Sequence, residues 1–276
     1  IKGSIKLASN ENPIGPSKKA LNVIKKFISK ECEIHRYPDG SGYYLKNALT
    51  NNIKGITLEE IILGNGSNEL IDIAVRTFMK EGDEAIMATP SFVVYSMAVH
   101  SVNGKAVEIP LKDYRHDLSA FADAINEKTK MVFIANPNNP TGTINKRNEF
   151  EDFIRKVPDS VLVVIDEAYY EYVTDKKYPD TLKYLHSTKH LLILRTFSKA
   201  YGLAGLRIGY GISKKEIITE MNKIREPFNT NAIAQLAATE ALSDLKHIKR
   251  TIDINEKGKK YLYKALDSLG IQYVPT

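Results

Sequence analysis

The stretch 191-LLILRTFSKAYGLAGLRIG-209 joins a short apolar run to a segment rich in glycine, hydroxyl and basic side chains. Its first four residues have the length and composition of a β-strand that is covered on both faces. Lys199 follows this run among small and apolar neighbours, and Arg207 comes after a glycine-rich turn. A lysine on a solvated surface does not need such neighbours. We therefore infer that Lys199 takes part in chemistry at the end of a buried strand.

Other apolar runs resemble the run at 191–194, and each is bounded by Gly, Pro, Asp or Asn. Segments with the period of amphipathic helices lie between them. Strands that alternate with helices favour an α/β fold of three layers, with a mostly parallel central sheet between two layers of helices. The further runs are 61–63, 85–88, 131–135 and 161–165, and the clearest helical segments are 68–82, 117–128 and 146–157.

The composition restricts the class of protein and its partners. The 276 residues carry 39 Lys and Arg against 33 Asp and Glu, but the lysines are spread along amphipathic segments, so we do not expect a nucleic-acid partner. No stretch has the apolar length of a membrane span. Cys32 is the single cysteine, which excludes an internal disulfide and suits a reducing cytoplasm. His186 and His190 are spaced i, i+4, but no third ligand candidate is near, so no metal site is expected.

Unusual residues follow the predicted strands. In a parallel sheet the ligand lies outside the carboxyl ends of the strands, so these residues should meet at one edge. The turn 136-NPNNPTG-142 offers asparagine side chains, and 166-DEAYYEY-172 places Asp166 at the end of a buried strand, with Tyr169 shortly after it. A buried carboxylate is costly unless it meets a cation or a hydrogen-bond donor. The simpler interpretations are an ordinary turn and a cap on the next segment.

Two more strand ends carry candidate residues. The glycine-rich turn 64-GNGSNELI-71 leads into a predicted helix, whose free backbone N–H groups could bind an anion. It matches neither the Walker A pattern nor a full GxGxxG motif, and an ordinary N-cap at Ser67 is the alternative. In 89-TPSFVVY-95, Phe92 and Tyr95 lie near a strand end, where an aromatic ring is more often part of the core than a platform for a ligand.

Together these residues fit one cofactor, pyridoxal 5′-phosphate. A lysine forms a Schiff base with an aldehyde when its surroundings favour the neutral amine. A carboxylate pairs with a protonated pyridine nitrogen, an asparagine and a tyrosine hydrogen-bond the ring oxygen, and an aromatic side chain stacks on the ring face. An anion cradle binds the phosphate. The predicted cradle is formed by Gly66, Ser67, Thr196, Ser198 and Arg207.

The set 139-NPTG-142, 166-DEAY-169 and 196-TFSKAYGLAGLRIG-209 resembles the fold-type-I aminotransferases of class I and II. These enzymes depend on pyridoxal phosphate and share the fold of aspartate aminotransferase. Further segments resemble the histidinol-phosphate aminotransferase branch of the family, and the resemblance covers nearly the whole chain. These segments are 7-LASNENPIGPS-17, 35-HRYPDGSG-42, 64-GNGSNELI-71 and 225-REPFNTNAIAQ-235.

The resemblance implies a role for each residue of the site. Lys199 is similar to the lysine that holds the cofactor and moves the proton, and Asp166 is similar to the partner of the ring nitrogen. Asn139 and Tyr169 resemble the ligands of the ring oxygen, and Tyr169 is counted with Lys199 and Asp166 as catalytic. Phe92 resembles the stacking ring, where the family often has tyrosine. The implied ligands of the phosphate are Gly66, Ser67, Asn68, Thr196, Ser198 and Arg207, with Asn68 where the family often has aspartate.

The resemblance also implies partners and an activity. Tyr37 resembles a tyrosine that reaches the cofactor phosphate of the neighbouring subunit, which implies a homodimer with shared sites. The implied reaction is transamination between histidinol phosphate, a phosphorylated amino alcohol, and 2-oxoglutarate, which becomes glutamate, in histidine biosynthesis in the cytoplasm. Aromatic amino acid transamination and threonine-phosphate decarboxylation use similar chains and stay open. A regulatory module that binds pyridoxal phosphate without turnover is a further alternative, although it does not need a proton-moving lysine.

Three regions are expected along the chain. Residues 1–30 form an N-terminal arm and a helix of a small domain, residues 31–245 form the large domain that binds pyridoxal phosphate, and residues 246–276 begin a small C-terminal domain. A long amphipathic helix from residue 246 leads into 269–276, which has the composition of an entering strand. We expect this domain to be cut short at Thr276, before the arginine with which the family binds the phosphate or carboxylate of its substrates.

Overall fold

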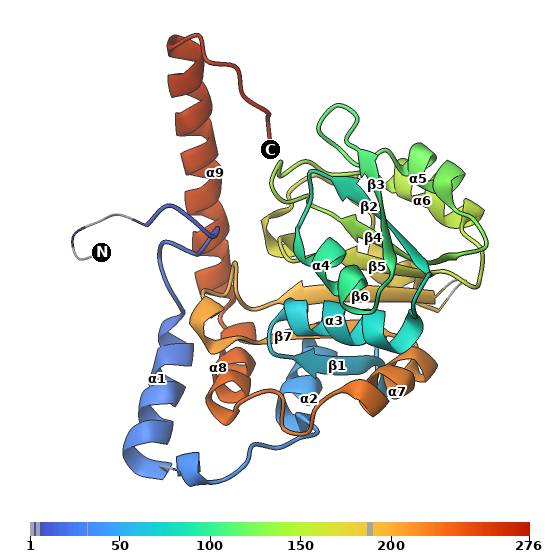
Figure 1. The fold of residues 1–276 in the computed structure, drawn as a ribbon. Helices are drawn as coiled ribbons and strands as arrows, with labels where there is room; N and C mark the ends of the chain where they lie inside the picture. The colour runs from blue at the N-terminus through green and yellow to red at the C-terminus, as the bar shows by residue number, and fades with distance from the viewer. Residues whose placement is uncertain (1–2, 4–5, 32, 187–189) are drawn as a thin grey trace.

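The computed structural model describes residues 3, 6–31, 33–186 and 190–276. Cys32, on which the disulfide prediction rests, lies outside the described residues. A seven-stranded sheet in the order β1-β7-β6-β5-β4-β2-β3 forms the centre (Figure 1). Strand β7 is antiparallel to both of its neighbours and the other pairs are parallel, so the predicted mostly parallel sheet is confirmed. The strands are β1 (Ile61–Gly64), β2 (Glu84–Thr89), β3 (Lys105–Pro110), β4 (Thr129–Ala135), β5 (Leu162–Asp166), β6 (His190–Thr196) and β7 (Gly209–Ser213).

The five predicted apolar runs form β1, β2, β4, β5 and β6, and most of their residues are buried, as a strand covered on both faces requires. Strands β3 and β7 were not predicted. Strand β3 lies at the edge of the sheet and is partly exposed along its length. Strand β7 has the sequence GYGIS, whose glycines and serine give no apolar run. It is nevertheless buried throughout because it lies between β1 and β6.

Helices cover both faces of the sheet, and successive strand residues face opposite layers. On one face, α3, α4 and α7 pack on residues such as Ile62 and Val164. On the other face, α2 and α8 pack on Ile61 and Leu63, while α5 and α6 cover the strands further along the sheet. The predicted three-layer architecture is therefore confirmed. The helices are α1 (Lys18–Lys26), α2 (Tyr43–Asn52), α3 (Ser67–Phe78), α4 (Val94–Ser101), α5 (Leu118–Ala124), α6 (Arg147–Lys156), α7 (Lys215–Ile224), α8 (Ala232–Leu242) and α9 (Leu245–Ser268).

The predicted helices are present with somewhat different ends. Helix α1 begins after Ser17, whose side chain accepts a hydrogen bond from Ala20 N, and a π-helical turn (Phe27–Glu31) follows it. Helices α3, α5 and α6 lie within or close to the segments that the helical period indicates. Among the described residues, no helix combines the length and the apolar composition that crossing a membrane requires.

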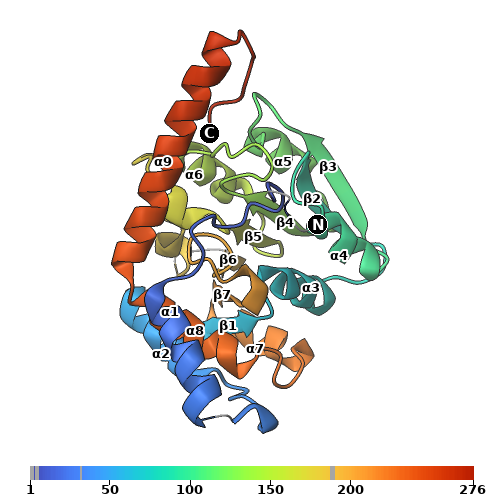
Figure 2. The same cartoon turned by 90° about the vertical axis from the view of Figure 1, so that its left-hand side faces the viewer.

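Helix α9 projects beyond the rest of the molecule, while the N-terminal segment lies against its first turns (Figures 1 and 2). Asn12 Nδ2 makes this contact by donating a hydrogen bond to Thr251 Oγ1 (3.2 Å). The strand predicted at 269–276 is wrong, because residues 271–276 have no regular secondary structure. Instead of pairing with a strand, the backbone oxygen of Thr276 accepts hydrogen bonds from the side chains of Lys259 and Tyr263 in α9.

Candidate active site

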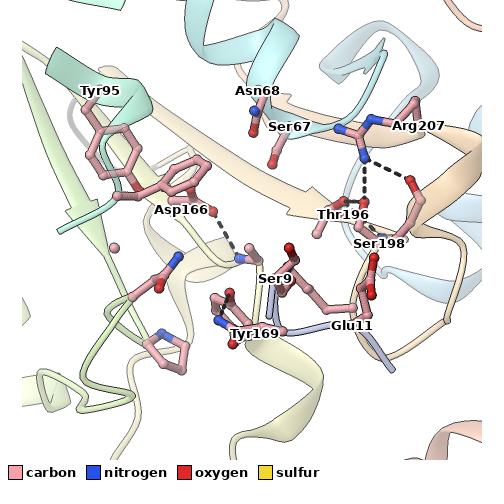
Figure 3. Close-up of a pocket in the computed structure, with 18 of the residues that line it drawn as sticks. Ser9, Glu11, Ser67, Asn68, Tyr95, Asp166, Tyr169, Thr196, Ser198 and Arg207 are labelled. Atoms are coloured by element: carbon pink, nitrogen blue, oxygen red, sulfur yellow. Dashed lines mark hydrogen bonds between the residues drawn. The ribbon is translucent and has the colours of Figure 1, made fainter. Parts of the chain in front are cut away.

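A cavity of about 600 Å³ opens at the carboxyl ends of β4, β5 and β6, beside the first turn of α3 (Figure 3). This is the edge at which the strand-end residues were predicted to meet. Figure 3 shows Asp166 on one side of the cavity and Thr196, Ser198 and Arg207 on the other. The predicted site residues that line the cavity are Ser67, Asn68, Phe92, Asn139, Asp166, Tyr169, Thr196, Ser198, Lys199 and Arg207.

Lys199 follows β6 and is half-buried at the floor of the cavity. Its Nζ donates a hydrogen bond to the backbone oxygen of Ser9 (3.0 Å) and lies 5.5 Å from the centroid of the Tyr169 ring. Burial lowers the pKa of Lys199, and the nearby charge of Arg207 lowers it further, while Glu11 and Asp166 oppose these effects. The neutral amine is therefore easier to reach than in water, as nucleophilic attack on an aldehyde requires.

Asp166 is the last residue of β5, and its side chain is almost completely buried. Oδ2 accepts a hydrogen bond from the phenol of Tyr95 (2.8 Å), and Oδ1 accepts one from Ala168 N (3.0 Å). The pKa of Asp166 is raised, because burial outweighs the lowering effect of these two hydrogen bonds. The bond to Ala168 N resembles the simple cap that was the alternative interpretation. However, the carboxylate also lines the cavity, where it can meet a cationic ligand atom.

The three asparagines of the turn after β4 have different positions. Asn136 and Asn138 are buried and hold the turn together: Asn136 Oδ1 accepts from Asn145 N (2.9 Å), and Asn138 Nδ2 donates to Thr141 Oγ1 (2.9 Å). Asn139 lines the cavity. The turn is therefore both structural and, through Asn139, part of the candidate site.

An anion cradle occupies the side of the cavity next to α3. Arg207 Nη1 donates to Ser198 Oγ (3.2 Å), and Thr196 Oγ1 lies 3.0 Å from the same oxygen. Ser67 is the first residue of α3, and Gly66 is the N-cap, so the alternative of Ser67 as the N-cap is wrong. A helix N-terminus, a guanidinium and several hydroxyl groups together form a set of donors that suits a phosphate.

Gly66 does not line the cavity but lies behind Arg207. A Cβ atom at this position would overlap the Arg207 guanidinium, and the backbone φ of +78° is one that residues with side chains rarely adopt. Asn68 lines the cavity beside Ser67. Gly66 therefore contributes space for Arg207, whereas Ser67 and Asn68 contribute polar groups.

Aromatic residues border the cavity on the side of Asp166. Phe92 lines it, and its ring contacts the ring of Tyr95 nearly at a right angle (centroids 5.6 Å apart, planes at 84°). Tyr37 does not line the cavity of its own chain. Its side chain is 82 % exposed and stacks on Phe228 (centroids 4.6 Å apart). An exposed position is what a residue needs if it is to reach a neighbouring subunit.

The donors and acceptors fit pyridoxal 5′-phosphate in number and kind. One cavity is surrounded by an amine, a buried carboxylate, an amide with a phenol, an aromatic ring and an anion cradle. Each matches a different group of that cofactor. Among the residues that the structure describes, no group of three or more His, Cys, Asp or Glu side chains could hold a metal ion.

A profile of the family described as aminotransferase class I and II matches residues 2–276. The chain belongs to this family. Among its relatives, a histidinol-phosphate aminotransferase of Moorella thermoacetica is 47% identical, and the match covers 100% of this chain and 71% of that protein. A second one, from Hydrogenovibrio crunogenus, is also 47% identical, and the match covers 98% of this chain and 72% of that protein. The family that the sequence motifs predict is thus confirmed.

Solved structures agree with this aminotransferase fold. The crystal structure of histidinol-phosphate aminotransferase from Sinorhizobium meliloti in complex with pyridoxal-5′-phosphate superposes with a TM-score of 0.90 at 28% identity, and the match covers 97% of this chain and 72% of that one. The histidinol-phosphate aminotransferase of Clostridium acetobutylicum gives a TM-score of 0.84 at 27% identity, and the match covers 95% of this chain and 76% of that one.

The site of this aminotransferase contains residues to which the sequence assigned no role. The N-terminal segment contributes Ser9, Asn10 and Glu11 to the cavity, and Asn10 Nδ2 donates to the Tyr169 hydroxyl (3.1 Å). The polar, extended character of 7-LASNENPIGPS-17 was the available signal, but nothing in it says where the segment lies. Tyr95, interpreted as a core aromatic, is buried and also lines the cavity.

Arg195 also received no role from the sequence. Its guanidinium is buried, forms an ion pair with Glu167 (2.8 Å) and lies 3.8 Å from the centroid of the Tyr170 ring. Glu167 directly follows β5, and Arg195 is the next-to-last residue of the neighbouring strand β6. The ion pair therefore connects the end of β5 to the end of β6. It thereby supports the floor from which Asp166 and Lys199 reach the cavity.

Proposed function

We propose that this aminotransferase binds pyridoxal 5′-phosphate in the cavity and exchanges an amino group between histidinol phosphate and 2-oxoglutarate. The observation that carries the proposal is the arrangement of Lys199, Asp166 and the anion cradle around one cavity. When bound, pyridoxal phosphate supplies an aldehyde that takes up the amino group and a ring that spreads the charge left on the substrate carbon. The substrate class is supported by the relatives, which are named histidinol-phosphate aminotransferases.

Lys199 would hold the cofactor through its Nζ and would move the proton of the substrate. Because burial and Arg207 lower its pKa, its Nζ is available as a neutral amine. Nζ takes a proton from the substrate carbon that bears the amino group. Asp166, whose two oxygens each accept a hydrogen bond, would hold the proton on the ring nitrogen.

The remaining residues orient the cofactor. Asn139 and Tyr169 would donate hydrogen bonds to the ring oxygen, and Asn10 leaves the Tyr169 proton free because Asn10 is the donor in their bond. Phe92 would pack on the ring face. The N-terminus of α3 with Ser67 and Asn68 would bind the phosphate, together with Thr196, Ser198 and Arg207.

We propose that the protein acts as a homodimer in the cytoplasm and that Tyr37 completes the phosphate site of the neighbouring subunit. Exposed aromatic side chains support a partner: Tyr37 and Phe228 are exposed and stack on each other, and Tyr43 and Tyr44 at the start of α2 are exposed as well. The division into residues 1–30, 31–245 and 246–276 also stays a proposal. The projecting α9 supports it, because that helix leaves the body that holds the sheet.

A panel of amine donors tests the function. The purified protein is loaded with pyridoxal phosphate and supplied with 2-oxoglutarate, and glutamate is measured with histidinol phosphate, phenylalanine or threonine phosphate as donor. We expect the highest kcat/KM with histidinol phosphate. Faster turnover of phenylalanine would assign the chain to aromatic amino acids, and carbon dioxide release from threonine phosphate would assign it to decarboxylation. A bound cofactor without turnover of any donor would favour a regulatory module.

A further inference from the structure

Tyr95 is held rigidly between the core and the cavity. It lies in the first turn of α4, and 1% of its surface is exposed. The face of its ring stacks on Phe133 of β4 (centroids 4.7 Å apart, planes at 11°), and the ring of Phe92, which lines the cavity, contacts it nearly at a right angle. These contacts fix the direction of the phenol, since a ring packed on two sides cannot turn without displacing its neighbours.

The phenol oxygen of Tyr95 lies 2.8 Å from Asp166 Oδ2 (Figure 3). Burial and the neighbouring carboxylate both raise the pKa of Tyr95 well above its usual value, so the phenol keeps its proton and is the donor. Asp166 is thus the acceptor, which favours its ionised form. The second oxygen of Asp166, Oδ1, accepts a hydrogen bond from Ala168 N. Two donors from different parts of the fold therefore fix the plane of the carboxylate.

We propose that Tyr95 is a positioning residue that keeps Asp166 ionised and directed at the ring nitrogen of the bound cofactor. This inference rests on the proposed function, because it assumes that the ring nitrogen meets Asp166. A phenylalanine at position 95 would fill the same space but would leave Asp166 Oδ2 without this donor. A buried carboxylate that loses a donor holds its charge less well and so holds the ring proton less tightly.

The test compares Tyr95→Phe with the parent protein on two cofactors. One is pyridoxal phosphate, and the other is its analogue in which carbon replaces the ring nitrogen. With pyridoxal phosphate we expect the dissociation constant to rise about tenfold to a hundredfold, the loss typical of one hydrogen bond to a charged group. With the analogue, which gives Asp166 no ring nitrogen to meet, the two proteins should bind within about twofold of each other.

Absorbance gives a second readout that does not depend on turnover. The visible absorbance of the bound cofactor changes with pH, and in Tyr95→Phe its midpoint should rise by about one pH unit. The reason is that a ring nitrogen that holds its proton less tightly withdraws less charge from the rest of the cofactor.

Tyr178→Phe is the matched control. The phenol of Tyr178 is also buried and donates to the backbone oxygen of Asn136 and to Glu167, but Tyr178 does not line the cavity. Its loss should affect the binding of both cofactors equally and leave the absorbance midpoint unchanged. Equal losses with both cofactors in Tyr95→Phe, or no change with pyridoxal phosphate, would overturn the role of Tyr95. A parent protein that gives no visible band with pyridoxal phosphate would instead overturn the proposed function.

Discussion

The guanidinium of Arg207 lies directly over Gly66, in the space that a side chain at position 66 would occupy. Gly66 is the N-cap of α3, and Arg207 leads into β7. The two segments that form the anion cradle therefore come into contact at Gly66, which has no side chain to keep them apart. Arg207 itself has a left-handed backbone (φ +55°), which is uncommon for a residue with a side chain. The cradle therefore depends on a glycine on one side and on an unusual turn on the other.

Gly66→Ala should lower both stability and cofactor affinity. The positive φ of Gly66 costs a residue with a side chain about 1 to 2 kcal/mol, and the added methyl group also displaces Arg207 from the cradle. We expect the dissociation constant of pyridoxal phosphate to rise by about tenfold or more. Urea unfolding of the apoprotein and cofactor titration measure the two effects separately.

Gly55→Ala is the control for this prediction. Gly55 also has a positive φ (+82°), but a Cβ there meets no atom within 4 Å. Both variants should lose stability because of the positive φ, whereas Gly55→Ala should bind the cofactor normally. If both variants bind it equally well, the contact between Gly66 and Arg207 does not shape the cradle.

Lys199→Ala should abolish the covalent link to the cofactor. Pyridoxal phosphate should still bind through the cradle, but the absorbance of the Schiff base should be lost, and borohydride should no longer fix the cofactor to the protein. Turnover should fall by about a thousandfold or more, because no other lysine among the described residues lines the cavity and could move the proton. Lys54→Ala, a change at an exposed lysine, should have none of these effects. A borohydride-fixed cofactor in Lys199→Ala would show that another amine holds it.

Asp166→Ala should separate binding from chemistry. The cradle and Lys199 are untouched, so the cofactor should remain bound and coloured. Turnover should fall by about a hundredfold to ten-thousandfold because the ring nitrogen loses the carboxylate that holds its proton. Single-turnover absorbance measurements with the amine donor check this directly. Normal transamination by this variant would remove Asp166 from the mechanism.

The effects of Arg195 and Glu167 on the stability of the protein should be coupled, because the two buried charges neutralise each other. Either single change, Arg195→Met or Glu167→Gln, leaves one buried charge without its partner and should cost about 3 to 5 kcal/mol. The double variant Arg195→Met, Glu167→Gln should cost clearly less than the sum of the two. Chemical denaturation of the three apoproteins measures the difference.

The exposed pair Lys223–Glu220 provides the comparison. Its removal should cost less than about 1 kcal/mol, because both side chains stay solvated. A double variant at Arg195 and Glu167 as unstable as the sum of its single variants would show that the two residues act independently.

The strands and the edge that carries the site could be predicted because they depend on local sequence. A run such as 161–165 is apolar along its whole length, and all parallel strands end at the same edge of the sheet. Lys199, Asp166 and Asn139 each follow such a run, so their meeting in one cavity follows from the fold class.

The residues that were missed depend on partners far away in the sequence. Tyr95 donates a hydrogen bond to Asp166 71 positions later, and Arg195 pairs with Glu167 28 positions earlier. A single sequence gives each of these side chains the properties of its type but not the identity of its partner. The same holds for β7, whose residues become buried only because β1 and β6 lie on either side of it.

His116 should make the folded state sensitive to mild acid. The imidazole is 3% exposed, its Nε2 lies 3.0 Å from Asn138 Oδ1, and burial lowers the pKa of His116 to about 4. In the unfolded chain its pKa is near the ordinary value of about 6.5. Between these two values the unfolded state binds a proton that the folded state does not, so stability falls as the pH falls from about 6.5 to about 4. The loss from this residue alone is about 3 kcal/mol over that range.

Urea unfolding of the apoprotein at several pH values between 7.5 and 4.5, approximately, measures this slope. His116→Gln should be less stable near neutral pH, because the packing of the ring against Phe121 is lost, but its stability should depend less on pH. His100→Gln, at an exposed position in the last turn of α4, should keep the slope of the parent protein. Since Asn138 also belongs to the turn that presents Asn139, acid should loosen this part of the site before the rest of the sheet. Equal slopes in the parent protein and His116→Gln would mean that other groups cause the acid sensitivity.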